Sequence, residues 1–85
     1  MTQVTILMGS ASDKPIAQKA EKILDKMNIT FETYVASAHR TPARVAEVIE
    51  NSSADVFIAL AGLSAALPGV VAAHTLKPVI CVTCA

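Results

Sequence analysis

The sequence contains few aromatic residues and no excess of basic charge. Of its 85 residues one is Tyr, two are Phe and none is Trp, and seven Lys and Arg balance seven Asp and Glu. Nucleic acids are usually bound through clustered basic residues, with aromatic side chains among them that stack on the bases. Neither pattern occurs here, so we expect no nucleic acid partner.

Long apolar runs are also missing. A membrane helix needs roughly 20 consecutive apolar residues, and the longest candidate, residues 56–73, is interrupted by two glycines, a serine and a proline. The start of the chain lacks the basic residues of a secretory signal, and the apolar run after it is too short. We therefore expect no membrane association and a cytoplasmic location.

Cysteine occurs only at Cys81 and Cys84, a single CxxC pair. A zinc site would need a second such pair or Cys and His at ligand spacing. In an extended strand, residues three apart point to opposite faces, which separates the two sulfur atoms. The sequence thus favours neither a metal site nor a redox pair.

Apolar residues, in contrast, are abundant. They make up 53% of the chain, above the roughly 45–50% of ordinary domains, yet a domain this short buries only about 60% of its unfolded surface. We expect one domain, residues 1–85, in which the excess apolar surface lies at an interface or belongs to a longer protein that has been truncated.

Apolar strand-like runs alternate with helical patterns along the chain. The strands are expected at 4–8, 31–36, 56–61 and 79–82, with the second nearer a sheet edge. The βαβαβαβ order predicts an α/β fold in which a doubly wound parallel sheet has the strand order 2-1-3-4.

The first helix is expected after Asp13, which is placed to cap it, and before Asn28, which tolerates the left-handed backbone of a helix end. One face of this helix carries the apolar side chains of Ile16, Ala17, Ala20, Ile23, Leu24 and Met27. The last helix is expected after Gly69 and is apolar nearly all round.

Three loops, residues 9–13, 37–42 and 61–69, each follow a strand. Ligands of such sheets bind at the carboxyl ends of the strands, where the strand order reverses, here between the first and third strands. The three loops are therefore expected to converge on one ligand.

The loop at 37–42 carries most of the reactive groups. Thr41 and Pro42 are typical of a helix start, with Thr as the cap and Pro at the first helical position. A helix N-terminus beside Arg40 attracts anions, Ser37 adds a hydroxyl, and the imidazole of His39 exchanges protons near neutral pH. The alternative is that the segment only starts a helix and His39 is an ordinary loop residue.

The other two loops offer complementary groups. Ser10, Ser12 and Asp13 supply hydroxyls and a carboxylate that suit a phosphate and a sugar diol, although the loop lacks both nucleotide-binding fingerprints and is also compatible with a plain turn. The loop at 61–69 has little side-chain chemistry. We expect its backbone to approach a flat ligand, with a turn at the Leu-Pro-Gly of 67–69.

These motifs together resemble one family. Gly-Ser-Ala-Ser-Asp at 9–13, Ser-Ala-His-Arg-Thr-Pro at 37–42, and Ala-Gly at 61–62 followed by Leu-Pro-Gly at 67–69 resemble, in order and spacing, the phosphoribosylaminoimidazole carboxylase catalytic subunit family, also called N5-carboxyaminoimidazole ribonucleotide mutase. The resemblance runs essentially the whole length. It implies a three-layer flavodoxin-like fold, a homo-octamer and a step of de novo purine synthesis on a phosphoribosyl aminoimidazole substrate.

The resemblance assigns proton transfer to His39 and substrate binding to Ser10, Asp13 and Arg40. The loop chemistry extends the set of substrate-binding candidates to Ser12, Ser37, Gly62 and Leu67. No cofactor or metal is expected, because the aminoimidazole ring itself supplies the electrons for carboxylation.

Two departures from the family pattern leave alternatives open. Ala66 stands where many bacterial members have a histidine, and members continue well beyond the fourth strand, whereas this chain ends at Ala85. The chain is a mutase, a carboxylase that uses carbon dioxide directly, a non-catalytic module that binds phosphoribosyl ligands, or an inactive fragment.

Overall fold

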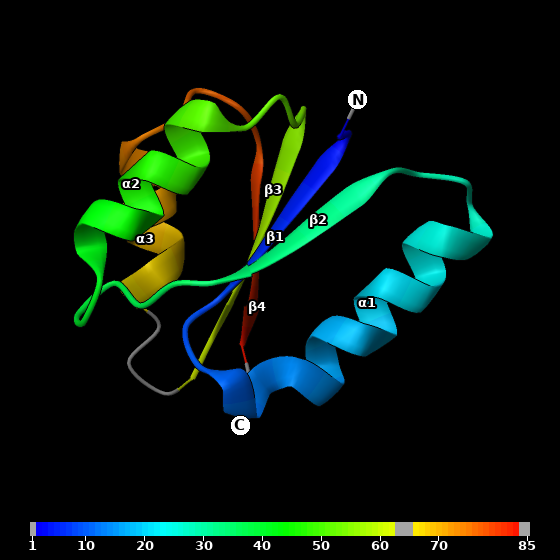
Figure 1. Cartoon of the computed structure of the whole chain (residues 1–85), viewed down its shortest axis with the longest axis horizontal. Coiled ribbons are helices and arrows are strands. Elements are labelled where there is room, and N and C mark those ends of the chain that lie inside the picture. Colours follow the sequence, from blue (N-terminus) through cyan, green and yellow to red (C-terminus); the bar gives the residue numbers. More distant parts are fainter. Residues whose placement is uncertain (1, 63–65, 84–85) are drawn as a thin grey trace.

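Four strands form one parallel sheet in the computed structural model, which describes residues 2–62 and 66–83. The order is β2 (Phe31–Val35), β1 (Val4–Met8), β3 (Val56–Ala61) and β4 (Val79–Thr83), as Figure 1 shows. This confirms the α/β class and the predicted order 2-1-3-4. Strand β2 ends one residue earlier than expected and β4 one residue later.

Strand β1 is the centre of the sheet and is buried along its whole length. It is in register with both neighbours, so that Met8 lies opposite Val35 of β2 and Leu60 of β3. Its one polar side chain, Thr5, is satisfied by a 2.7 Å hydrogen bond between its hydroxyl and that of Ser52. The aligned registers bring the carboxyl ends of the three strands to one edge of the sheet.

The two faces of the sheet are covered differently. Helices α2 (Pro42–Asn51) and α3 (Ala66–Ala73) lie on one side of the sheet and α1 (Lys14–Lys26) on the other (Figure 1). On the α2–α3 face, Leu7 and Phe57 belong to a core cluster that includes Val45 and Val71. On the α1 face, the alternate residues of β1 (Val4, Ile6 and Met8) pack in a smaller cluster with Ala17 and Leu60.

Helix α1 ends as expected but buries less than its apolar stripe predicts. Asn28 has a positive φ of 58°, which confirms the left-handed residue at the helix end. Ile23 and Met27, predicted to be part of the buried face, are 59% and 63% exposed. The packed line instead follows Ile16, Ala17, Ala20 and Leu24.

Helix α3 begins earlier than expected. The turn predicted at residues 67–69 is wrong, because Leu67, Pro68 and Gly69 are already helical. Proline is tolerated there because it is the third residue of the helix, and the amides of the first turn have no acceptor within the helix. No glycine in the described part of the chain needs a positive φ.

The described residues contain no cluster of three or more His, Cys, Asp or Glu that could hold a metal ion. Cys81 is exposed on β4, whereas the second cysteine of the CxxC pair, Cys84, lies outside the described residues. Within residues 2–62 and 66–83, no helix is long and apolar enough to cross a membrane.

Candidate functional site

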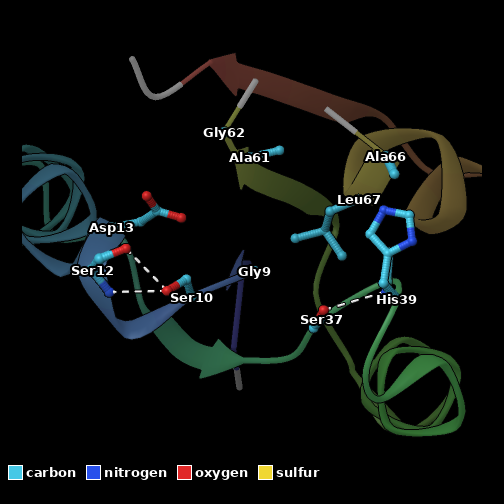
Figure 2. A pocket seen from close by; sticks show the side chains of 11 residues that line it. Gly9, Ser10, Ser12, Asp13, Ser37, His39, Ala61, Gly62, Ala66 and Leu67 are labelled. Carbon is cyan, nitrogen blue, oxygen red and sulfur yellow. Dashed lines mark hydrogen bonds between the residues drawn. The ribbon is translucent and has the colours of Figure 1, made fainter. Parts of the chain in front are cut away.

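Segments that follow β1, β2 and β3 surround a hollow of about 230 Å³ at the carboxyl ends of these strands. The hollow brings together seven of the eight residues predicted to form the site, as Figure 2 shows. These are Ser10, Ser12, Asp13, Ser37, His39, Gly62 and Leu67. The eighth, Arg40, does not line this hollow. The convergence of the three loops at this edge is confirmed.

The first wall is the short 3-10 helix η1 (Ala11–Asp13), which follows β1 after Gly9 and Ser10. Ser10 caps it: the Ser10 hydroxyl accepts a hydrogen bond from the Ser12 amide at 3.3 Å and lies 3.0 Å from the Ser12 hydroxyl. The predicted cap of α1 is half right: Asp13 occupies the cap position, but its backbone is already helical and its side chain makes no cap hydrogen bond. Its carboxylate is directed into the hollow (Figure 2).

The second wall is the loop that carries His39. The Ser37 hydroxyl accepts hydrogen bonds from the amides of His39 at 3.3 Å and Arg40 at 3.1 Å. The Thr41 hydroxyl accepts from the Ser37 amide at 2.9 Å and donates to the Ser37 carbonyl at 3.3 Å. The predicted cap of α2 is therefore half right: Thr41 occupies the cap position, but its hydroxyl turns back to close the loop and makes no cap bond.

The imidazole of His39 is exposed to solvent at the mouth of the hollow. Figure 2 shows the ring beside Leu67 and directed toward Ala66, across the hollow from Asp13. Asp13 is the only acidic residue among the described residues that line the hollow. A group able to exchange a proton thus faces a carboxylate across a space that is open to solvent.

The third wall comes from the end of β3 and the start of α3. Ala61 and Gly62 line the hollow, as do Ala66 and Leu67. Leu67 is only 3% exposed and also belongs to the core between α3 and the sheet, so it is a fixed apolar wall. Leu63 and Ser64, which were part of the predicted loop, lie outside the described residues.

A second hollow of about 490 Å³ adjoins the first and shares Gly9, Ser10 and Ser37 with it. Arg40 lines this second hollow, together with Arg44. Arg44 is not among the residues predicted to form the site. The available signal was its position one helical turn after Arg40, at the third residue of a helix that begins with Pro42.

The chain also matches the model of a known family. The model of the AIR carboxylase family matches residues 3–85. A protein of Methanocaldococcus jannaschii named N5-carboxyaminoimidazole ribonucleotide mutase is 61% identical over 79 residues, which cover 93% of this chain and 50% of that protein. A Haemophilus influenzae protein of the same name is 46% identical over 81 residues, which cover 92% of this chain and 49% of the relative.

A third relative, from Methanobrevibacter smithii, is named a probable N5-carboxyaminoimidazole ribonucleotide mutase. It is 51% identical over 81 residues, which cover 92% of this chain but 24% of the relative. The chain thus spans half or less of the length of these three proteins. Since the family model matches nearly every residue from Gln3 onward, the chain belongs to the AIR carboxylase family.

Proposed function

We propose that the chain forms the substrate site of an N5-carboxyaminoimidazole ribonucleotide mutase, which moves a carboxylate from N5 to C4 of the aminoimidazole ring. The observation that carries the proposal is the hollow at the carboxyl edge of the sheet, where His39 faces Asp13 between walls of small and apolar residues. The substrate class comes from the names of the relatives.

The two adjoining hollows suit the two ends of a ribonucleotide. In the proposal, the flat ring lies in the smaller hollow against Leu67 and the backbone of Ala61 and Gly62. The ribose hydroxyls face Asp13 and Ser12, and the 5′-phosphate enters the larger hollow beside Arg40. Ser10 and Ser37 line both hollows and would contact the middle of the ligand.

His39 would carry the proton in both halves of the reaction. The bond between N5 and the carboxylate carbon breaks as the imidazolium protonates the nitrogen, which releases carbon dioxide. The electron-rich C4 then attacks the carbon dioxide, and the neutral imidazole removes the C4 proton. The proton returns to His39, so the cycle closes without net acid or base, and an imidazole suits both roles because its ordinary pKa is near neutrality.

A direct carboxylase is the second candidate function, and the name of the family favours it. Here C4 attacks dissolved carbon dioxide, and His39 removes the same proton. A module that binds phosphoribosyl ligands without catalysis, or an inactive fragment, is a further alternative, because the chain spans only half of its relatives' length.

The proposal extends to assembly and location. A homo-oligomer, an octamer by the family resemblance, is supported by apolar side chains left exposed near the β4 edge, among them Leu76 and Ile80. A cytoplasmic location is supported by the small phosphorylated substrate that the relatives' names imply.

The test is an assay of the purified chain with each candidate substrate, with and without bicarbonate, followed by ultraviolet absorbance. A mutase converts N5-carboxyaminoimidazole ribonucleotide without added bicarbonate. A direct carboxylase converts aminoimidazole ribonucleotide only when bicarbonate is present. Binding of either ribonucleotide without turnover identifies a binding module, and neither binding nor turnover identifies an inactive fragment.

A further inference from the structure

The larger hollow is lined by positive charge without any acidic side chain. Among its described lining residues are the guanidinium groups of Arg40 and Arg44 and the hydroxyl-bearing residues Ser10, Ser37 and Thr41, but no Asp or Glu. These are the two arginines of the chain. Guanidinium groups with hydroxyl neighbours match the oxygen atoms of a phosphate.

Arg44 is held in place by the end of the edge strand. Its Nε donates a hydrogen bond to the carbonyl of Val35, the last residue of β2, at 3.2 Å. This bond uses one N–H of the guanidinium and leaves its two terminal amino groups. No ion pair joins Arg40 or Arg44 to a carboxylate in the part of the chain that the structure describes.

The start of α2 carries positive charge, which is unfavourable at a helix N-terminus. Arg40 precedes the helix, Arg44 is in its first turn, and the first turn contains no acidic residue. Cations near a helix N-terminus oppose the helix dipole, whereas anions are stabilised there. Because Thr41 provides no side-chain cap either, a bound anion would relieve both the repulsion between the arginines and the unfavourable end charge.

We propose that Arg44 is a second phosphate-binding residue, which binds a phosphomonoester in the larger hollow together with Arg40. The identity of the natural ligand rests on the proposed function, but the recognition of a phosphomonoester does not. Arg40 comes from the loop and Arg44 from the helix, so the ligand would fix the loop and the helix relative to one another.

The experiment measures binding of ribose 5-phosphate, and of ribose as the uncharged comparison, to the 85-residue chain by calorimetry at low salt. Arg44→Gln removes the charge, and Arg44→Lys keeps it but loses the planar fork. Lys19→Gln on the exposed surface of α1 is the matched control, because it removes one charge far from the hollow. Arg40→Gln provides the reference for loss of the other guanidinium.

We expect Arg44→Gln to weaken binding of ribose 5-phosphate about tenfold, or about 1.4 kcal/mol, and Arg44→Lys to weaken it less. Lys19→Gln should leave the affinity within about twofold. The difference in affinity between the wild type and Arg44→Gln should shrink at high salt, because the charges are exposed. Circular dichroism should show that each variant keeps the wild-type helix content.

The proposal is overturned if Arg44→Gln and Lys19→Gln bind equally well, or if the wild-type chain distinguishes ribose 5-phosphate from ribose by less than about twofold. Failure of the proposed function would give a different combination of turnover and binding results. A chain with no turnover of aminoimidazole ribonucleotides, but with phosphate binding that depends on Arg44, refutes the mutase and supports the phosphate site.

Discussion

The hydroxyl of Thr41 accepts a hydrogen bond from the backbone amide of Ser37 at 2.9 Å. The same hydroxyl donates to the Ser37 carbonyl, and the Ser37 hydroxyl in turn accepts from the amide of His39. The loop is thus closed on itself by side chains at both of its ends, and His39 lies between them. A closed loop holds the imidazole at the mouth of the hollow before any ligand binds.

Replacement of Thr41 by Val should open this loop without unfolding the protein. The Ser37 amide loses its acceptor, so its hydrogen exchange should become about tenfold faster, while the cost in global stability stays near 1 kcal/mol because the bond is exposed. Exchange measured by NMR tests this. Thr41→Ser keeps the hydroxyl and should exchange like the wild type; equal exchange in all three proteins would contradict the role of Thr41.

The sequence was sufficient to predict the sheet and seven residues that line the smaller hollow, but not the details of its loops. Strand β1 is buried on both faces, and its central place in the order 2-1-3-4 determines which loops meet at the carboxyl edge. The roles of Thr41 and Asp13 depend instead on how a hydroxyl or a carboxylate is turned after folding. Such choices between competing hydrogen bonds leave no periodic pattern in the sequence.

The same limit explains why Arg44 was not predicted to line a hollow. Its position in the hollow depends on a hydrogen bond to the carbonyl of Val35, nine residues earlier and in another element. The start of α3 escaped prediction because Pro68 and Gly69 usually mark turns, whereas the apolar burial of Leu67 and Val71 favours a helix that begins at Ala66. Packing outweighed local preference there.

If the proposed mutase activity is correct, His39→Asn should abolish turnover of the aminoimidazole ribonucleotide and leave its binding within about tenfold, or about 1.4 kcal/mol. The amide is close in size but cannot exchange a proton near neutral pH. Rates and dissociation constants measured on the same preparation separate the two effects. A variant that keeps more than about a tenth of the wild-type rate would refute the role of His39 as the proton carrier.

Arg40→Leu should weaken binding of the ribonucleotide by about 2 to 4 kcal/mol, because the variant lacks the charge-assisted contact to phosphate that we propose for Arg40. Binding of the dephosphorylated riboside should barely change, since no charge faces Arg40 in that complex. Calorimetry with both ligands gives the comparison. Equal losses for the two ligands would mean that Arg40 supports the fold of the site and does not bind the phosphate.

Tyr34 is the single tyrosine of the chain, so its ionisation can be followed by absorbance. Its phenol donates a hydrogen bond to Glu32, and this bond, with burial and the negative charge of Glu32, raises the pKa of Tyr34 above its ordinary value of 10.0. Arg44 acts in the opposite direction and lowers this pKa. We therefore expect Glu32→Gln to lower the ionisation midpoint and Arg44→Gln to raise it.

The raised pKa of Tyr34 also determines how the stability of the fold changes with pH. Because the folded-state pKa is above the unfolded one, the hydrogen bond contributes stability below about pH 10 that is lost as the pH rises through the folded-state pKa. Denaturant unfolding of the wild type and of Tyr34→Phe should therefore differ at pH 7 and converge in strongly alkaline solution. A difference that grew with pH would contradict the assigned hydrogen bond.

The edge of the sheet at β4 gives the last prediction. Ile80 on this strand is 51% exposed and Leu76 just before it is fully exposed, while β4 lies at the edge of the sheet and, among the described strands, pairs with β3. An edge strand that exposes apolar side chains invites pairing with another chain. We expect the chain to associate at micromolar concentration, as measured by light scattering during size exclusion.

Ile80→Lys should shift the chain toward the monomer, because a charged edge resists pairing. Ile23→Lys is the matched control: Ile23 is 59% exposed on α1 and far from that edge. A wild-type chain that elutes as a monomer and unfolds cooperatively would contradict the prediction, as would equal dissociation by the two lysine variants.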